Sequence, residues 1–178
     1  TPIVRMKTVQ SQLAAWAKQV NHHCETGSNL VLNGSVGTGK THLAVGLARA
    51  IITQGGTVRY LSETDVVEAM QATYGGNGSP RAVLDSLTLP DVLIVDEVGR
   101  SNGSNDSVRI MGELVNARWQ KKKPVVVLTN GSREKFVEAV GEHGADRLSG
   151  TSCTVINMKW PSARSSKLID DEEAGAGR

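Results

Sequence analysis

Short apolar runs alternate with longer amphipathic stretches along most of the chain. The short runs are rich in Val, Leu and Ile and predict strands over 30–32, 57–61, 91–97, 125–128 and 154–156. The longer stretches carry apolar residues three or four positions apart and predict helices over 8–24, 42–54, 63–73, 81–87, 107–122 and 132–140. Because strands alternate with helices, the expected fold class is α/β, a three-layer parallel five-stranded sheet with helices on both faces.

Several local signals refine the helix predictions. Ser62 and Asp65 form a Ser-x-x-Asp capping pattern at the start of the helix over 63–73. A Gly-rich break over 75–80 follows that helix, and Pro124 ends the helix over 107–122. The residues of the latter helix that are expected to face inward are Ile110, Met111, Leu114, Val115 and Trp119.

The segment between the first predicted strand and the next helix has the pattern of a phosphate loop, G-x-x-x-x-G-K-[ST]. Its glycines let backbone N–H groups surround a polyphosphate, and the helix N-terminus adds positive potential there. Lys40 is expected to reach the β- and γ-phosphates of ATP, and the Thr41 hydroxyl to ligate Mg²⁺. The predicted nucleotide-binding residues are Gly34, Ser35, Val36, Gly37, Thr38, Gly39, Lys40, Thr41, His42 and Asp96. An ordinary glycine turn is the alternative, which the flanking strand and helix disfavour.

Two acids, Asp96 and Glu97, end the third predicted strand. The carboxyl ends of strands in an open α/β sheet are where ligands bind, so both acids are expected beside the phosphate loop. Asp96 is predicted to hold a water on Mg²⁺ and Glu97 to polarise the attacking water, with Asn130 at the end of the next strand orienting it. Two surface acids that merely end a strand are the alternative. A metabolic kinase fits least, because it needs no such base.

Composition narrows the possibilities further. A chain of 178 residues is long enough for one α/β domain, and its formal net charge of +2 means that any nucleic-acid contact needs a local basic patch. Cys24 and Cys153 lie far apart, which favours a reduced, cytoplasmic setting over a disulfide or metal site. His22, His23 and Cys24 are adjacent, so they would point in different directions on a helix rather than converge on a metal. No apolar run approaches the roughly 18 residues of a membrane span.

Together these motifs resemble the AAA+ family, and within it the branch that holds the DnaC helicase loaders and the IstB transposition helpers. The segments that carry the resemblance are 34–44, 93–99, 128–130, 141–148 and 160–165. The resemblance implies an AAA+ ATPase core over 1–165 and no C-terminal helical lid after the fifth strand. It also implies a helicase-binding domain that would precede Thr1. The polar, acidic end of the chain separately predicts a disordered tail over 166–178.

The resemblance also implies roles for individual residues. Arg147 lies where the family has its arginine finger, which reaches the γ-phosphate of a neighbouring subunit, and Arg164 lies in the second sensor. A surface salt bridge between Asp146 and Arg147 is the alternative. By the same resemblance, an insertion over about 63–88 faces single-stranded DNA. The candidate DNA contacts are Tyr74, Arg81, Arg100, Ser104 and Arg109. A second basic cluster comprises Arg118, Lys121, Lys122 and Lys123. The alternative is that this cluster stays solvated and complements the dipole at the helix C-terminus.

The expected function is ATP-dependent loading of a replicative DnaB-type helicase onto single-stranded DNA. ATP and Mg²⁺ would join neighbouring copies of the chain into a spiral, and hydrolysis would release the partner. The alternatives are an IstB-like transposition ATPase that acts on duplex DNA, and a nucleotide-gated scaffold whose hydrolysis is vestigial.

Overall fold

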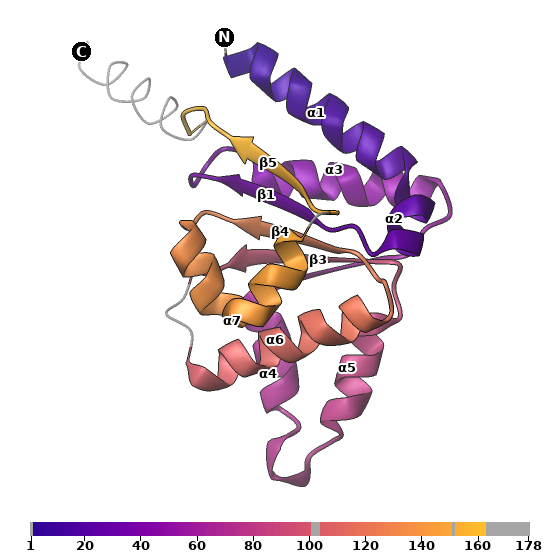
Figure 1. Cartoon of the computed structure of the whole chain (residues 1–178), viewed down its shortest axis with the longest axis vertical. Helices are drawn as coiled ribbons and strands as arrows, with labels where there is room; N and C mark the ends of the chain where they lie inside the picture. Colours follow the sequence, from indigo (N-terminus) through magenta and orange to yellow (C-terminus); the bar gives the residue numbers. More distant parts are fainter. Residues whose placement is uncertain (1, 101–103, 151, 163–178) are drawn as a thin grey trace, which may run out of the picture.

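Five parallel strands form the centre of the computed structural model, which describes residues 2–100, 104–150 and 152–162 (Figure 1). The strands are β1 (Leu30–Gly34), β2 (Val58–Ser62), β3 (Val92–Val98), β4 (Val125–Thr129) and β5 (Thr154–Met158). Their order in the sheet is β2-β3-β4-β1-β5, and every pairing is parallel. The predicted α/β fold class and five-stranded sheet are confirmed.

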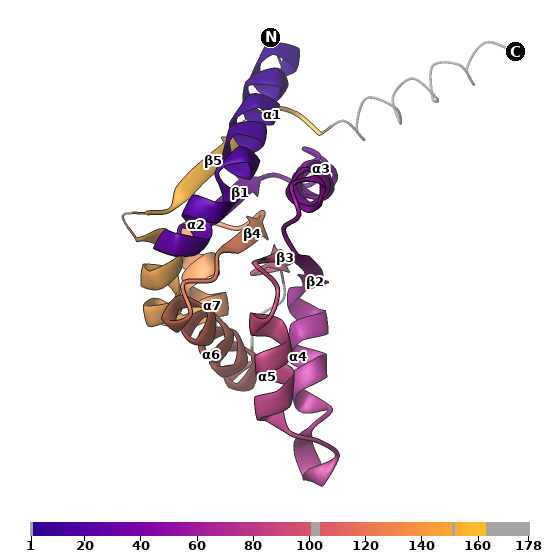
Figure 2. The same ribbon diagram turned by 90° about the vertical axis from the view of Figure 1, so that its right-hand side faces the viewer.

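Helices cover both faces of this sheet, as expected (Figures 1 and 2). The helices are α1 (Pro2–Lys18), α2 (Val20–Thr26), α3 (Lys40–Thr53), α4 (Glu63–Gln71), the 3-10 turn η1 (Tyr74–Gly76), α5 (Pro80–Thr88), α6 (Asn105–Gln120) and α7 (Arg133–Ser149). Apolar residues of α1, α2 and α3 pack on one face, and those of α4 to α7 pack on the other. In the described residues, no helix follows β5.

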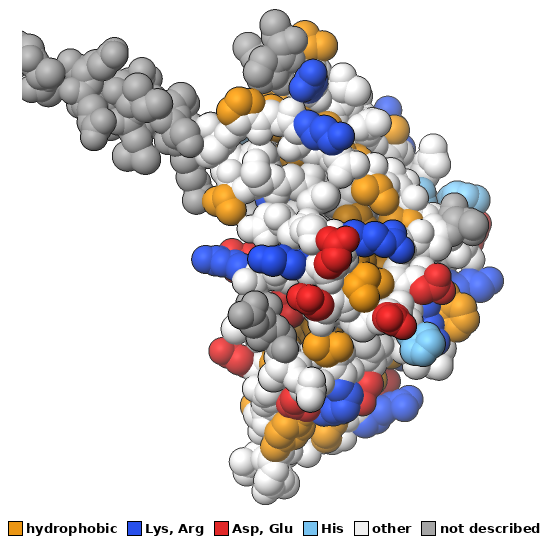
Figure 3. Space-filling model, turned by 60° about the vertical axis from the view of Figure 1, so that its left-hand side comes forward, with side chains coloured by type: hydrophobic (Ala, Val, Ile, Leu, Met, Phe, Trp, Pro, Cys, Tyr) orange, Lys and Arg blue, Asp and Glu red, His pale blue; other side chains and the backbone are white. Residues whose placement is uncertain are grey.

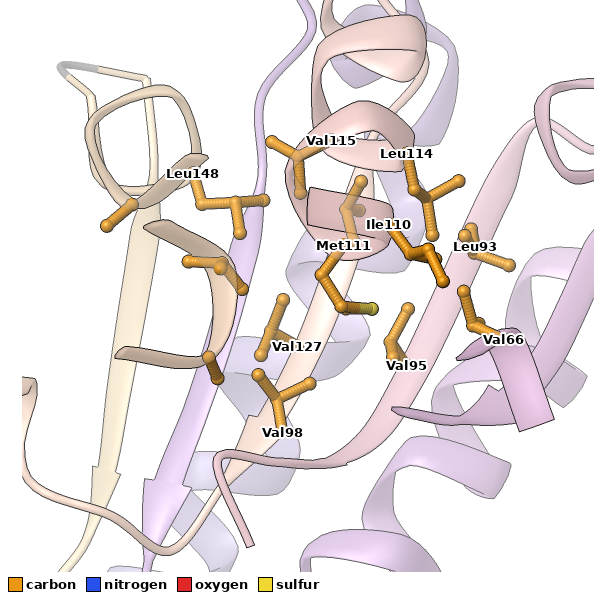
Figure 4. Close-up of a cluster of buried hydrophobic side chains, with 14 of the residues drawn as sticks. Val66, Leu93, Val95, Val98, Ile110, Met111, Leu114, Val115, Val127 and Leu148 are labelled. Carbon is orange, nitrogen blue, oxygen red and sulfur yellow. The ribbon is translucent and has the colours of Figure 1, made fainter. Parts of the chain in front are cut away.

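Alternation along each strand divides the core into these two layers, because successive side chains of a strand point to opposite faces. In β4, Val125 and Val127 pack towards α6 and α7. Val126, between them, packs towards α1 and α3. Figure 4 shows the first layer, where Met111 of α6 lies among valines of the sheet. Both faces are therefore buried, which explains why the strands read as nearly continuous apolar runs.

The N-terminal helix differs from the prediction. The apolar periodicity over 8–24 predicts one helix, but the structure has α1 and α2 with a break at Gln19, whose φ and ψ are −104° and 17°. The break brings the ring of His23 onto that of Trp16, with 4.3 Å between the ring centroids. Because apolar residues continue on both sides of Gln19, the periodicity gives no sign of the break.

The helix after Ser132 also runs further than 132–140. Its first half is confirmed, with Ser132 as the N-cap, and it continues as α7 to Ser149. Gly141 interrupts the helical geometry with a φ of 73° and a ψ of 160°, and glycine adopts such a positive φ without a steric cost. Gly141, which directly follows the expected end of the helix, is therefore a kink within α7.

Two adjacent residues of α6 exchange the environments that were predicted for them. Trp119 is 55% exposed rather than inward, whereas Arg118 is 0% exposed. Arg118 continues the buried stripe because it lies three and four positions after Val115 and Leu114. Its guanidinium donates to the carbonyls of four residues: Leu87, Pro90, Asp91 and Pro124. Burial lowers the pKa of Arg118 to about 10.

The predicted basic cluster is therefore not a free cationic surface. Besides the burial of Arg118, Lys123 donates to Asp91 Oδ1 at 2.8 Å, and Lys121 lies 3.5 Å from Asp85 Oδ1. Asp91 Oδ2 accepts two further hydrogen bonds, from the backbone N–H and the hydroxyl of Thr57. The hydrogen bond from Lys123, followed by those from Thr57, lowers the pKa of Asp91 to about 2. This network joins the segment that enters β3 to the segments that enter β2 and β4.

The α4–η1–α5 hairpin, residues 63–88, projects from the rest of the molecule (Figures 1 and 2). The predicted capping box at its base is confirmed. The Ser62 hydroxyl accepts from Asp65 N at 3.0 Å, and the Asp65 carboxylate accepts from Ser62 N at 2.8 Å. Across the described part of the chain, every helix is too short or too polar to cross a membrane.

Candidate functional site

The phosphate-loop sequence forms a tight connection between the end of β1 and the start of α3. Gly37 and Gly39 have φ angles of 82° and 88°, in the region that glycine adopts most readily. A side chain at Gly37 would also collide with Ser162, since an added Cβ would lie 1.9 Å from its hydroxyl oxygen. Trp160 Nε1 donates to Thr38 O at 3.1 Å and fixes the loop from the C-terminal side. The loop thus presents backbone and the N-terminus of α3, a geometry that suits an anion.

Lys40, the first residue of α3, folds its side chain back into this loop. Its Nζ lies 2.7 Å from Gly34 O and 3.0 Å from Ser35 O. Burial lowers the pKa of its ammonium group, and the nearby Asp96 carboxylate opposes this change. The Lys40 ammonium group is therefore hydrogen-bonded to carbonyl oxygens of the loop, close to where a phosphate would lie.

Asp96 is held by hydrogen-bond donors from three elements. Its Oδ2 accepts from the Thr41 hydroxyl at 2.8 Å and from the Tyr60 hydroxyl, while its Oδ1 accepts from Glu97 N at 2.7 Å. Tyr60 lies on β2, is 37% exposed, and was missed by the sequence reasoning. No motif marks it, because only the pairing of β2 with β3 brings it beside Asp96. Burial and the bond to Asp96 raise the pKa of Tyr60, so its hydroxyl remains a donor.

Glu97 lies at an irregularity of β3. Val95 pairs with Val127 and Val98 with Thr129, so β3 has one more residue than β4 over this stretch and forms a β-bulge. Within this bulge Glu97 has a φ of 62°, which is uncommon for a residue with a side chain. Its exposed carboxylate forms an ion pair with the Arg100 guanidinium.

One cleft of about 660 Å³ brings most of these residues together. Ligand pockets in proteins commonly measure about 300–1,000 Å³, so its size suits a nucleotide. Its lining comprises Val36, Gly37, Gly39, Lys40, Thr41, His42, Val45, Asp96, Glu97, Arg100, Leu128, Thr129 and Asn130. The hydroxyl of Thr41 and the carboxylate of Asp96 are hard oxygen donors 2.8 Å apart, the ligand type that Mg²⁺ prefers. The donor set therefore fits a magnesium-bound nucleotide.

Arg147 lies outside the described lining of this cleft. Its guanidinium stacks over the ring of Trp119, 5.1 Å from the ring centroid, beside a hollow between α6 and α7. Asp146 makes no ion pair with Arg147 within the parts of the chain that the structure describes. Arg164, the other predicted arginine, lies outside the described residues.

The candidate DNA contacts do not form a single group. Tyr74 and Arg109 are brought together, since Arg109 Nη2 donates to the Tyr74 hydroxyl at 2.7 Å and both bond Asp106. The other three candidates make different contacts: Arg81 pairs with Asp85, Arg100 pairs with Glu97 in the cleft, and Ser104 is the N-cap of α6.

Figure 3 brings forward the edge where the strands end. Lys and Arg side chains there stand beside Asp and Glu side chains, and the described part of this face has no continuous basic surface. The distribution agrees with the low net charge of the chain.

Comparisons with known proteins agree with this geometry. A family model described as IstB-like ATP binding protein matches residues 9–165. The replicative helicase loader DnaC of Escherichia coli K12 is 31% identical over 161 residues, which cover 88% of this chain and 65% of DnaC. DnaC of Buchnera aphidicola subsp. Acyrthosiphon pisum is 26% identical, over 79% of this chain and 58% of that protein. The chain thus spans about two thirds or less of these curated relatives.

Solved structures share the fold. A crystal structure of the DnaC helicase loader superposes with a TM-score of 0.77 at 21% identity, covering 88% of this chain and 91% of that one. The replication initiator DnaA bound to AMPPCP and single-stranded DNA gives a TM-score of 0.68 at 19% identity, covering 89% of this chain and 50% of DnaA. With its phosphate loop, its 2-3-4-1-5 sheet and the match over 9–165, the chain belongs to the IstB-like ATP-binding family, with the AAA+ fold of DnaC.

Proposed function

We propose that this chain is the ATP-hydrolysing core of a helicase loader, which couples ATP turnover to holding single-stranded DNA and a replicative DnaB-type helicase. One observation carries the proposal. A phosphate loop, the Thr41–Asp96 oxygen pair and the acid Glu97 line a single cleft in a chain that is similar to DnaC over 88% of its length. Holding a nucleotide needs only the first two features. Glu97 beside them supports hydrolysis.

Nucleotide binding would exchange partners within the cleft. Lys40 would leave the carbonyls of Gly34 and Ser35 for the β- and γ-phosphates, and the Thr41 hydroxyl would leave Asp96 for Mg²⁺. The metal would supply neutralisation of charge on the phosphate oxygens. Asp96 would stay oriented, because Tyr60 and the Glu97 N–H still donate to it.

Hydrolysis would need a second exchange. Glu97 pairs with Arg100, so its carboxylate must leave this ion pair before it can bond a water. We place Glu97 as the group that orients and deprotonates the attacking water once Arg100 has moved away, with the amide of Asn130 at the same cleft helping to fix that water. Arg100 is then a residue of the nucleotide site, and a direct role in holding DNA is secondary to this one.

We further propose that Arg147 acts on the nucleotide of a neighbouring copy in a homo-oligomeric spiral. Arg147 lies on α7 with its guanidinium over Trp119 of α6, outside the described lining of its own cleft, and this position suits action in trans. Stacking on the exposed ring of Trp119 would hold the Arg147 guanidinium in place at the surface before a neighbouring copy binds. An arginine supplied in this way contributes about 10³ to 10⁵ in rate in other NTPases.

For single-stranded DNA, we place the main contact at the hairpin. The Tyr74 side chain is 42% exposed, and its hydroxyl is anchored to Asp106 and Arg109, so the ring is held where a base could stack on it. Stacking of a base on an aromatic ring contributes about 1–3 kcal/mol. The charge of Arg109 is already balanced by Asp106 and Glu113, so its contribution to phosphate binding is small.

The test is binding of a labelled oligonucleotide, single-stranded and duplex, with ATP, with ADP and without nucleotide, at stated salt. We expect tighter binding of the single strand in ATP, loss of that preference in Lys40→Ala, and weaker binding in Tyr74→Ala. Tyr74→Phe is the matched control, because it keeps the ring and removes only the hydroxyl that bonds Asp106 and Arg109. Equal binding in ATP and ADP would contradict the proposed switch.

An IstB-like transposition ATPase that acts on duplex DNA is the second candidate, and the family match over 9–165 is what favours it. Preference for duplex DNA in the same assay would select it. A nucleotide-gated scaffold is the third candidate, and an assay that detects ATP turnover would exclude it. The cleft that contains both Glu97 and Asn130 supports turnover.

A further inference from the structure

The backbone at Glu97 is held in an unfavourable conformation by contacts on both sides of it. A non-glycine residue with a φ of 62° persists where surrounding contacts determine the backbone. On one side, the Glu97 N–H donates to Asp96 Oδ1 at 2.7 Å. On the other side, Val98 O accepts from the Thr129 hydroxyl at 2.8 Å, and the Gly99 N–H donates to Glu63 Oε2 at 2.8 Å. Glu63 is the only charged side chain among these contacts that comes from outside β3 and β4.

Glu63 is an unusual residue for its location. Its side chain is 3% exposed, and its Oε1 has no hydrogen-bond partner among the described residues. Burial raises the pKa of its carboxyl, and the hydrogen bond from Gly99 opposes this only in part. A buried carboxylate with one partner lowers stability relative to an apolar side chain. Stability therefore does not explain the presence of an acid at this position.

Glu63 connects the base of the hairpin to the backbone near Glu97. Glu63 is the first residue of α4 and directly follows Ser62, which pairs with Asp96 across β2 and β3. The capping box of Ser62 and Asp65 fixes this first turn, so Glu63 moves only with α4. At the far end of the hairpin, Tyr74 bonds Asp106 and Arg109 of α6. A shift of the hairpin would therefore move the Glu63 carboxylate and change its hydrogen bond to Gly99, two residues from Glu97.

We propose that Glu63 is a positioning residue that holds Glu97 in its left-handed backbone conformation through the Gly99 N–H and ties this conformation to the base of the α4–η1–α5 hairpin. The coupling to DNA rests on the proposed function, since it assumes that DNA contacts the hairpin and that Glu97 activates water. The hydrogen bond itself does not depend on that assumption.

Two substitutions separate this role from a structural one. Glu63→Gln keeps an oxygen acceptor for the Gly99 N–H, and the NH₂ that replaces Oε1 breaks no described hydrogen bond. Glu63→Met has a similar volume and lacks the acceptor. We expect Glu63→Met to lower kcat for ATP at least tenfold while KM stays within twofold of the wild type and the melting temperature does not fall. Glu63→Gln should restore kcat to within about threefold.

Amide hydrogen exchange over residues 96–100 gives a readout that does not depend on activity. Exchange at Gly99 should be faster in Glu63→Met than in the wild type or in Glu63→Gln. Unchanged exchange in Glu63→Met overturns the contact, and wild-type kcat in that variant overturns the positioning role. If Glu63→Gln is as slow as Glu63→Met, the charge rather than the acceptor matters, which also overturns the proposal.

The coupling is tested by adding single-stranded DNA to the same three proteins. We expect DNA to change kcat by the same factor in the wild type and Glu63→Gln, and to leave Glu63→Met unchanged although it binds DNA equally well. The same DNA response in Glu63→Met, or no response in a wild type that binds DNA, overturns the coupling. A wild type without ATP turnover or DNA binding overturns the proposed function instead, and the exchange measurement still decides the Glu63–Gly99 contact.

Discussion

Replacing Arg118 by methionine tests whether this buried cation is part of the scaffold or of a DNA-binding surface. Arg118 is fully buried, and its three shortest hydrogen bonds run to Leu87 O at 2.7 Å, Pro124 O at 2.8 Å and Asp91 O at 3.0 Å. These carbonyls belong to the end of α5 and to the segments that enter β4 and β3. One side chain of α6 thus joins the connection between α5 and β3 to the segment that enters β4.

The expected loss follows from two opposing contributions. A hydrogen bond to a charged group contributes about 1.5–3 kcal/mol, so the three shortest bonds of Arg118 together contribute about 6 kcal/mol. Burial lowers the pKa of Arg118 from 12.5 to about 10, which at 1.36 kcal/mol per pKa unit corresponds to an opposing cost of about 3 kcal/mol. Arg118→Met removes both, so we expect the free energy of unfolding to fall by about 3 kcal/mol. Against a total of about 5–15 kcal/mol, that is a large loss.

The assay is urea unfolding followed by circular dichroism, with Lys122→Met as the matched control. Lys122 is exposed and belonged to the same predicted basic cluster, so its substitution should change the free energy of unfolding by about 0.5 kcal/mol or less. An Arg118→Met protein within about 1 kcal/mol of the wild type would refute the assignment to the scaffold. So would a stable Arg118→Met protein that has lost DNA binding.

Four further predictions concern the cleft and the sheet. Lys40→Ala should weaken ATP binding about 10- to 100-fold in a titration with a fluorescent nucleotide, since a charged hydrogen bond is lost; unchanged affinity would remove Lys40 from the site. Glu97→Gln should bind ATP normally but lower kcat about 10²- to 10⁴-fold in a phosphate-release assay, and undiminished turnover would exclude it as the base. Tyr60→Phe should raise the Mg²⁺ concentration for half-maximal turnover about fivefold, because Asp96 loses a donor contributing about 1 kcal/mol; an unshifted Mg²⁺ curve would argue against this role. Asp91→Asn should cost about 1 kcal/mol at neutral pH, after allowance for its partly exposed side chain. Since the pKa of Asp91 is lower in the fold, about 2 against 3.8, its contribution is present above pH 4 and lost towards pH 2, so the two stability curves should converge in acid; parallel curves would contradict this.

The features that could be predicted from the sequence are those whose cause lies within a few neighbouring residues. The phosphate loop depends on the glycines between Gly34 and Lys40, and the cap of α4 depends on Ser62 and Asp65. Strands buried on both faces need continuous apolar runs, so β3 and β4 were evident as well. In each case the local chemistry leaves few alternatives for the backbone.

Features that depend on a helix face or on a single break were harder to predict. Trp119 and Arg118 are neighbours on α6, about 100° apart, and an apolar residue was the natural choice for the inner position. The buried carbonyls that make Arg118 the better occupant come from Leu87 and Pro124, which no periodicity in α6 reveals. Gln19 breaks the first helix although the apolar pattern continues across it.

Residues that hold the site in place were missed because they come from another strand and from the helix that follows it. Tyr60 and Glu63 lie more than thirty positions before their partners, with separations of 36 residues in both cases. Neither belongs to a motif, and their roles follow from the pairing of β2 with β3, which aligns Ser62 with Asp96.

This pairing has a consequence for how the fold could link its two proposed functions. β2 is an edge strand, and its C-terminal end lies beside the acid pair of β3. Tyr60 therefore bonds the Asp96 carboxylate, the proposed Mg²⁺ ligand, from within the strand, while Glu63 bonds the backbone after Glu97 from the first turn of α4. The α4–η1–α5 hairpin therefore begins with a residue, Glu63, that bonds the backbone two residues after Glu97. If the hairpin contacts DNA, coupling of that contact to ATP hydrolysis needs no long pathway. The buried carboxylate of Glu63 connects the base of the hairpin directly to the backbone that follows Glu97.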